Sequence, residues 1–209
     1  MLLENYYWYF KSAVPSRICD DIVKYGNQLK RQTALTGNDA PETLNKKQVE
    51  IIKKKRDSNI VWLNDRWVYN EVQPYIYKAN SQAGWNFEWD WSEACQFTKY
   101  EKGQYYGWHS DSWIKPYQAN NKNDPAHGKI RKLSATISLS DPKNYKGGEL
   151  EFDFRNLDPD KPNQPIKCTK ISAKGSIIVF PSFVWHRVSP VTSGERNSLV
   201  IWSLGYPFK

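Results

Sequence analysis

The apolar positions change their period along the chain, from a helical repeat in the first part to strict alternation in the second. Four apolar residues within 18–29 recur every three or four positions, which predicts a helix that begins near Pro15. A second stripe within 68–79 predicts another helix, and Pro74 inside it is expected to kink or restart the helix. Between them, 36–45 is expected to be an exposed loop and 60–63 a short strand.

After Trp85 the apolar residues alternate with polar ones, which is the period of a β-strand. Many short strands separated by turn residues are typical of a sandwich, jelly roll or barrel. The candidate strands are 87–91, 94–100, 104–109, 132–140, 148–154, 165–171, 176–180, 184–189 and 196–204. Because no repeat or low-complexity linker interrupts them, we expect one α+β domain over 1–209. In it, a helical region, 1–85, supports a mainly β core, 86–209.

Composition excludes several classes of protein. Aromatic residues make up 15% of the 209 residues, which is too many for a disordered chain. No apolar run approaches the ~18 residues of a membrane helix and no secretory signal is visible, so we expect no membrane partner. Cys19, Cys95 and Cys168 are widely spaced and form no C-x-x-C pair, which argues against a disulfide framework or a structural zinc site. These features favour a reducing, cytoplasmic location.

The formal net charge of +8 is concentrated in one run, Lys46-Lys47 and Lys53–Arg56. Such a run is typical of a solvated helical face. A nucleic-acid patch is the alternative interpretation, but no aromatic residue interleaves the run. We therefore expect no nucleic-acid partner.

An H-x-D motif, His109-Ser-Asp111, is predicted to lie within a strand. Side chains two residues apart on a strand point to the same face, so this pair could bind one metal ion. His186 ends the apolar run 177–186, and a folded β core could bring it beside the pair. Two imidazoles and a carboxylate are the ligands of non-haem Fe(II) oxygenases, although catalytic zinc uses the same set.

Arg196 follows His186 by ten residues, and Ser198 comes two residues later. Both side chains fall on one face of the candidate strand 196–204. A guanidinium fork beside a hydroxyl is well matched to a carboxylate in a partly dry pocket. This spacing predicts an anion site next to the metal site.

Three segments resemble, in chain order, the signatures of prolyl 4-hydroxylase-like oxygenases. The segment Tyr100–Asp111 resembles Y-x-x-G-Q-x-Y-x-x-H-x-D, and 133–141 followed by Gly147-Gly148-Glu149 resembles the family's next strand and its G-G-E turn. The segment 180–196 is similar to the final signature of PKHD-type hydroxylases, a branch of that group. Arg at position 196 fits this branch, whereas prolyl 4-hydroxylases often carry Lys there. The resemblance covers about 93–205 and extends loosely to 56–63.

The resemblance implies an iron(II)/2-oxoglutarate-dependent dioxygenase on a double-stranded β-helix, a jelly-roll core buttressed by helices. Its cofactors would be Fe(II), 2-oxoglutarate and O₂, with ascorbate as an optional reductant. The implied residues are the iron ligands His109, Asp111 and His186, the 2-oxoglutarate residues Arg196, Ser198, Tyr100 and Tyr106, and two residues expected to border the substrate, Trp113 and Trp185.

The implied activity is hydroxylation of an amino-acid side chain in a protein, a peptide or a free amino acid, with proline favoured and succinate and CO₂ released. One alternative is an AlkB-like nucleic-acid demethylase, which shares the iron triad. That family carries an R-x-N-x-[ST]-x-R run, and 196–202 lacks its spacing and its last Arg. The other alternative is a non-catalytic jelly-roll binding module, but such a module would usually have lost a ligand. The oligomeric state is not predicted.

Overall fold

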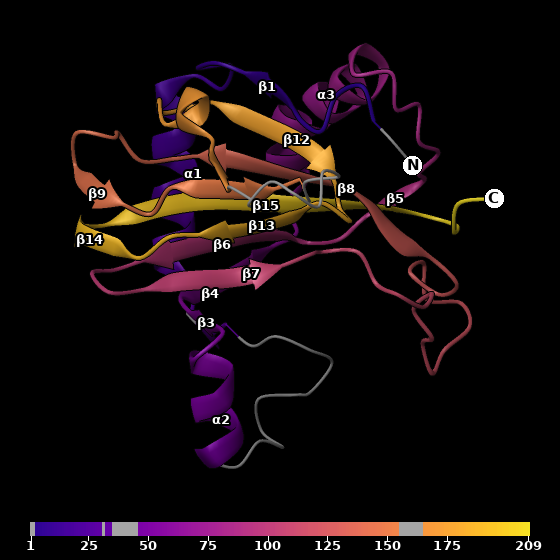
Figure 1. Cartoon of the computed structure of the whole chain (residues 1–209), viewed down its shortest axis with the longest axis horizontal. Coiled ribbons are helices and arrows are strands. Elements are labelled where there is room, and N and C mark those ends of the chain that lie inside the picture. The colour runs from indigo at the N-terminus through magenta and orange to yellow at the C-terminus, as the bar shows by residue number, and fades with distance from the viewer. Residues whose placement is uncertain (1–2, 31, 35–45, 155–164) are drawn as a thin grey trace, which may run out of the picture.

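The computed structural model describes residues 3–30, 32–34, 46–154 and 165–209, so the predicted loop 36–45 lies outside the described residues. Within these ranges, two antiparallel sheets face each other and helices pack against the outer face of the larger one (Figure 1). This arrangement confirms the predicted mainly β, α+β class with a jelly-roll core. The metal site predicted from the sequence lies between the two sheets.

The larger sheet has eight strands among the described residues, and every strand pair is antiparallel. Its order is β1 (Trp8–Phe10), β12 (Ile177–Pro181), β8 (Ile130–Ser138), β15 (Arg196–Gly205), β6 (Cys95–Tyr100), β4 (Asn59–Leu63) and β2 (Gln32–Thr33), with β5 (Trp91–Ser92) paired to β15.

The smaller sheet has five strands and is also antiparallel. Its order is β11 (Ile166–Lys167), β10 (Leu150–Asp153), β13 (Trp185–Val188), β7 (Tyr105–His109) and β3 (Arg56–Asp57). A separate ribbon pairs β9 (Tyr145–Gly147) with β14 (Val191–Gly194).

Two of the helices, α1 (Ser16–Gln28) and α3 (Arg66–Gln82), bury their apolar stripes against the larger sheet. Helix α3 runs through Pro74 as one helix, so the expected restart does not occur. Pro74 is exposed, and its ring therefore displaces nothing in the core. Helix α2 (Lys46–Lys53) instead projects away from the sheets, at the bottom of the view in Figure 1.

Side chains along β6 and β15 alternate between the two faces of the larger sheet, one packed on the helices and one facing the smaller sheet. Phe97 and Leu199 point to the helices and are almost fully buried in the main core cluster. Their neighbours Thr98 and Ser198 point the other way, toward the smaller sheet. The polar positions of these strands therefore line the space between the sheets, where a site can form.

Three details of the sequence prediction are wrong. Of the predicted strand 87–91, only Trp91 lies in a strand, β5, because the backbone of Phe87 forms two hydrogen bonds with the side chain of Asn80 instead. The predicted strand 165–171 shortens to β11 and continues as a 3-10 helix over Thr169–Ile171. The first 85 residues also supply strands to both sheets, so this region is not only a helical support.

Cys19, Cys95 and Cys168 are buried and form no disulfide among the described residues, as expected of small core residues. Along the described ranges, we find no helix with the length and apolar character that crossing a membrane requires.

Candidate metal centre and its pocket

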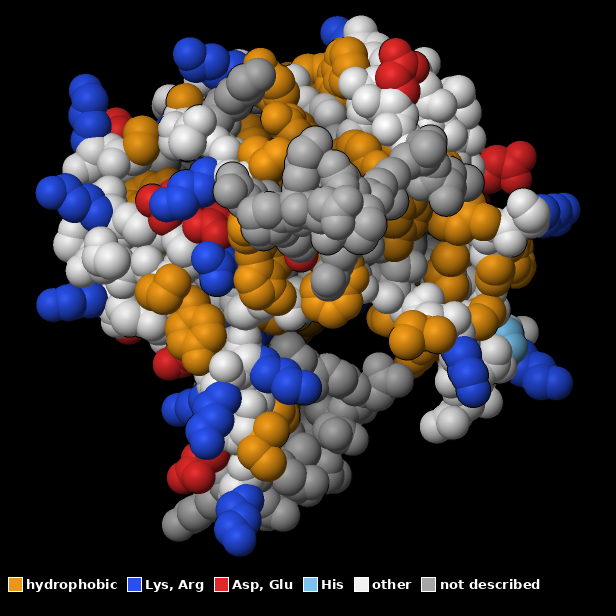
Figure 2. All heavy atoms as spheres, viewed as in Figure 1, with side chains coloured by type: hydrophobic (Ala, Val, Ile, Leu, Met, Phe, Trp, Pro, Cys, Tyr) orange, Lys and Arg blue, Asp and Glu red, His pale blue; other side chains and the backbone are white. Residues whose placement is uncertain are grey.

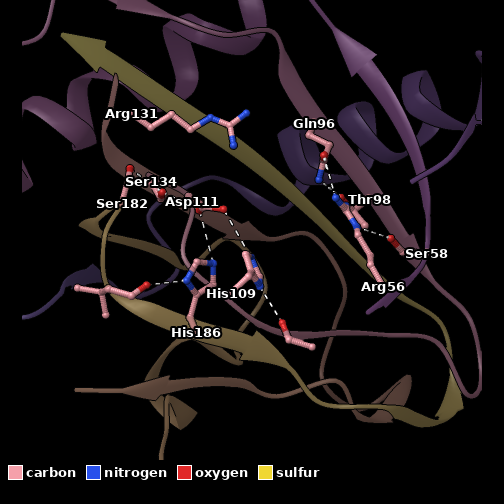
Figure 3. Close-up of polar contacts among 12 residues, drawn as sticks. Arg56, Ser58, Gln96, Thr98, His109, Asp111, Arg131, Ser134, Ser182 and His186 are labelled. Atoms are coloured by element: carbon pink, nitrogen blue, oxygen red, sulfur yellow. Dashed lines mark hydrogen bonds and ion pairs between the residues drawn. The ribbon is translucent and has the colours of Figure 1, made fainter. Parts of the chain in front are cut away.

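His109, Asp111 and His186 converge as the sequence predicted, with one ligand atom of each lying within 4.8 Å of the others (Figure 3). The two histidines face each other across the sheet because β7 and β13 pair His109 directly with His186. Each imidazole Nε2 lies 3.5 Å from an oxygen of Asp111, one from Oδ1 and the other from Oδ2. Three donors on one side leave the opposite side open, as a facial metal site requires.

Both histidine rings are fixed by backbone carbonyls. His109 Nδ1 lies 2.8 Å from the carbonyl oxygen of Gly107, and His186 Nδ1 lies 2.9 Å from that of Val184. Since a carbonyl only accepts, Nδ1 carries the proton in each ring and donates it. The lone pair of each Nε2 then faces Asp111, which is the tautomer that a metal ligand needs.

Asp111 lies just beyond β7 and not within a strand, which corrects the strand geometry that we expected for the H-x-D motif. The strand ends because the backbone N–H groups of Asp111 and Ser112 both donate to the carbonyl of Ser182, at 2.8 and 2.9 Å. Ser134 donates to Asp111 Oδ2 at 2.7 Å and lies 2.9 Å from the Ser182 hydroxyl. The carboxylate is therefore held by the end of β12 and by β8.

Charge and burial prepare these groups for a cation. Burial by itself would raise the pKa of Asp111, but His186, His109 and the nearby Arg131 together hold that pKa well below its usual range. Burial lowers the pKa of His186 to about 4. At neutral pH the site therefore offers an ionised carboxylate beside a neutral His186 ring, which are the forms that bind a metal.

Ser134→Ala is expected to weaken metal binding by roughly 10- to 100-fold, the usual effect of losing an outer hydrogen-bond partner. The physical reason is that the Asp111 carboxylate then loses its 2.7 Å donor and its fixed orientation. Anaerobic metal titration of the variant checks this. Ser138→Ala is the matched control, because Ser138 lies on the same strand but bonds to the carbonyl of Ile171. Equal affinities in the two variants would contradict the role of Ser134.

Arg196 and Ser198 line the same pocket as the triad, as the sequence predicted. The guanidinium of Arg196 is buried, donates to the Ser198 hydroxyl at 3.3 Å and lies 5.4 Å from the ring centre of Tyr100. Among the described residues, no carboxylate forms an ion pair with it. The Glu149 carboxylate interacts with the charge of Arg196 but forms no ion pair with it, so the buried guanidinium is suited to an anionic ligand.

The G-G-E turn leaves room for Arg196. A Cβ on Gly148 would lie 2.8 Å from Arg196 Cδ and 2.9 Å from Val191 Cγ2, and the φ of Gly148 is +65°. The sequence therefore places glycine where the side chain of Arg196 crosses the turn. Only a residue without a Cβ fits this space at this backbone angle.

Gly148→Ala is expected to raise the KM for the anionic co-substrate several-fold and to lower the free energy of unfolding by about 1–3 kcal/mol, because overpacking displaces Arg196. Gly103→Ala is the matched control, since Gly103 also has a positive φ, +88°, but open space around it. Co-substrate titration and thermal unfolding of both variants check this. An unchanged KM in Gly148→Ala would show that the turn does not position Arg196.

Both predicted tyrosines line the pocket. Tyr100 is buried and pairs with Arg196 across β6 and β15. Tyr106 stacks on the His109 ring, with ring centres 3.5 Å apart. Burial raises the pKa of Tyr106 to about 12, so its phenol stays protonated at neutral pH.

The two predicted tryptophans have different positions. Trp113 lies 5.0 Å from the guanidinium carbon of Arg131 and borders the site through that residue. Trp185 precedes His186 on β13, so its side chain points to the opposite face, and it is partly exposed. It does not line the pocket of the triad.

Sequence reasoning missed two arginines beside the triad. Arg131 forms a double hydrogen bond with Glu93, at 2.6 and 2.7 Å, and its guanidinium carbon lies 3.9 Å from the Trp202 ring centre. Arg56 is buried, although we predicted it within a solvated run (Figure 3). It bonds to Ser58 and Gln96, lies 4.4 Å from the Tyr106 ring centre, and leaves Nη2 without an acceptor among the described residues.

The sequence carried a weak signal for Arg56 but not for Arg131. Arg56 is two residues before Ser58, the i, i+2 spacing of a shared strand face, but the lysines before it concealed the change from helix to strand. Arg131 lies three residues before Ser134, a spacing that predicts opposite faces. It reaches the pocket side because the register between β8 and β15 shifts between Leu133 and Arg131.

A family model described as the 2OG-Fe(II) oxygenase superfamily matches residues 95–204. The chain belongs to this superfamily. Membership implies Fe(II) as the metal and 2-oxoglutarate and O₂ as co-substrates, and it confirms the resemblance drawn from the three sequence signatures.

Similar curated proteins are PKHD-type hydroxylases. One from Shewanella sp. (strain ANA-3) is 36% identical over 107 residues, and one from Pseudoalteromonas atlantica is 34% identical over 108 residues. Each match covers 51% of this chain, and the chain spans only about 40% of the length of these relatives.

Solved 2OG-Fe(II) oxygenases share the fold over nearly the whole chain. A viral collagen prolyl hydroxylase from Paramecium Bursaria Chlorella virus-1, in complex with 2OG, superposes with a TM-score of 0.63 at 20% identity and covers 97% of both chains. A prolyl hydroxylase from Trichoplax adhaerens, in complex with a hypoxia inducible factor peptide fragment, superposes with a TM-score of 0.59 at 16% identity. This match covers 96% of the present chain and 84% of the Trichoplax chain.

The residues present fit both groups that the family implies. Two Nε2 lone pairs and a carboxylate are ligands that suit Fe(II). The buried Arg196 guanidinium, without an ion-paired protein carboxylate, suits the distal carboxylate of 2-oxoglutarate.

Proposed function

We propose that this chain is an Fe(II)- and 2-oxoglutarate-dependent hydroxylase that acts on an amino-acid side chain of a protein or peptide, with proline as the favoured residue. The observation that carries the proposal is the buried Arg196, which lines one pocket with a complete His–Asp–His triad and pairs with no described carboxylate. A hydrolytic zinc site needs no such anchor. 2-Oxoglutarate has a carboxylate at each end, so its binding needs a cationic side chain beside the metal.

Each chain residue then has a defined task. His109, Asp111 and His186 hold the iron, and Arg196 with Ser198 orients the distal carboxylate of 2-oxoglutarate. Bound iron supplies the redox chemistry that couples decarboxylation of 2-oxoglutarate to insertion of one oxygen atom into a C–H bond. Tyr100 and Tyr106 close the pocket with aromatic rings and exclude water from it.

A peptide substrate is supported by what the similar proteins are named for. The curated relatives named PKHD-type hydroxylases and the neighbour solved with a peptide fragment agree with this class of substrate.

We also propose that residues 1–209 act as one catalytic domain. Strands β1 and β4 come from the first 85 residues and pair directly with β12 and β6 of the site. Separating 1–85 from 86–209 would therefore leave the larger sheet incomplete.

An anaerobic titration of the apoprotein with Fe(II) and 2-oxoglutarate tests the proposal. We expect the visible charge-transfer band of the iron–co-substrate chelate, and its loss in His109→Ala. Proline-containing peptides are then incubated with O₂, with and without ascorbate, and searched by mass spectrometry for the gain of one oxygen atom. A band without any oxidised peptide would overturn the peptide substrate. Tight zinc binding without a band would overturn the oxygenase proposal.

A further inference from the structure

The basic end of α2 is fastened to the strand that carries His109. The carbonyl oxygens of Lys53 and Lys54 accept from the Tyr105 hydroxyl at 3.2 and 3.0 Å, and that of Lys55 accepts from Gly107 N–H at 2.7 Å. The lysines make these bonds only through their backbone carbonyls, so their three side chains remain exposed. A fixed row of cations therefore stands beside β7, which ends at the metal site.

The segment that follows Asp111, 112–129, also carries exposed basic side chains. The segment 112–129 leaves Asp111 and returns to β8, and it projects beyond the sheets (Figure 1). Its Lys115 and Lys122 are exposed. Figure 2 shows Lys or Arg side chains along α2 and on the protruding segment opposite, with apolar side chains on the body of the protein near both.

These lysines lack the carboxylate partners that other cations of the chain have. Lys99, Lys129 and Lys174 each pair with a carboxylate. In the described parts of the chain, no carboxylate pairs with Lys53–Lys55, with Lys115 or with Lys122. Of the ten residues 46–55, five are lysine and only Glu50 is acidic. These exposed lysines, which we call the rim, thus carry a local excess of positive charge.

The positive charge continues inward. Arg56 follows Lys55 directly, is buried, and bonds only to neutral groups, Ser58 and Gln96. Arg56 lies 4.4 Å from the ring centre of Tyr106, which lines the pocket, so the cations run from the exposed lysines to a residue behind the pocket wall. Charge distributed along an opening attracts and orients a partner of opposite sign.

We propose that the substrate of this site is an acidic polypeptide segment, in which Asp or Glu residues flank the modified residue. This inference deepens the proposed function and rests on it. A polypeptide fits better than a nucleic acid because the run 46–55 contains no aromatic residue and no Arg, the side chains that stack on bases. The acidic flanks would contact Lys53–Lys55 on one side and Lys115 and Lys122 on the other.

Binding of fluorescein-labelled peptides to the chain, loaded anaerobically with Fe(II) and 2-oxoglutarate, tests this. The peptides share a central proline and carry flanking blocks of Glu, Gln or Lys. We expect the Glu peptide to bind about tenfold tighter than the Gln peptide at low salt, from several exposed ion pairs acting together. The preference should largely disappear in high salt, because exposed charges are then screened.

The variant K53E/K54E/K55E should lose the preference for the Glu peptide, while K11E/K24E/K30E, on exposed lysines elsewhere, should keep it. Both variants should keep the Fe(II)–2-oxoglutarate band. Equal binding of all peptides would overturn the inference, as would a preference that K53E/K54E/K55E retains. Tighter binding of a uridine oligonucleotide, lost in the same variant, would overturn it in favour of nucleic acid.

Turnover of the same peptides in O₂ separates this inference from the proposed function. Oxidation of all peptides at equal rates, with equal binding, would overturn the acidic preference and leave the hydroxylase function intact. Charge-selective binding without oxidation of any peptide would support the acidic partner and contradict the hydroxylation of peptides.

Discussion

Asp111→Asn is expected to weaken Fe(II) binding by more than ~100-fold, beyond the 10- to 100-fold or so that losing an outer partner costs. The change keeps the shape of the side chain but removes the one negative charge among the three ligands. It also places a neutral amide where two Nε2 lone pairs converge. The metal-induced rise in Tm, measured anaerobically, should disappear together with succinate release.

Asp124→Asn is the control for this substitution. Asp124 lies in 112–129 and accepts from the Ala126 N–H at 2.8 Å, a bond that an asparagine oxygen also accepts. The control should keep the metal-induced shift in Tm. Retention of that shift in Asp111→Asn would mean that the carboxylate is not a ligand.

Arg196→Met is expected to raise the KM for 2-oxoglutarate by at least ~30-fold, which corresponds to the ~2 kcal/mol lower limit for truncating a buried charge pair. The Tm without co-substrate should stay the same or rise, because a buried cation without a carboxylate partner is replaced by an apolar side chain of similar size. Titration of the charge-transfer band gives the affinity, and thermal unfolding gives the stability.

Arg196→Lys should lie between the wild type and Arg196→Met, since an ammonium keeps the charge but not the two-pronged geometry. Arg17→Met is the matched control, because Arg17 is exposed on α1 and forms a long ion pair with Asp21, at 4.0 Å. A large loss of Tm in Arg196→Met without a change in KM would assign Arg196 a structural role.

The sequence predicted the positions of the triad and of Arg196 because each depends on local spacing. His186 and Arg196 lie near the start of strands that turn residues delimit, so the alternation within each strand fixed the face of each side chain. The pairing of His109 with His186 could not be derived in this way, because it joins strands far apart in the chain. Only the sequence signatures brought these segments together.

Arg56 and Arg131 show why the rest of the site could not be predicted. The burial of Arg56 depends on β3 pairing with β7, which is a contact about fifty residues away in sequence. In the sequence, Arg56 continues a run of lysines, and only its i, i+2 spacing to Ser58 separates it from them. The position of Arg131 depends on Glu93, whose partner is decided by the register between distant strands. Tertiary pairing decided both positions.

Strand β15 has two functions, since its Leu199 and Ile201 belong to the helix-packed core while Arg196 and Ser198 face the pocket. A slip of β15 by one residue would turn every side chain to the other face. The guanidinium would then lie in the apolar core and a leucine in the co-substrate pocket. Folding into the wrong register would thus yield an inactive molecule that lacks its core. The same register that stabilises the sheet is therefore the one that assembles the active site.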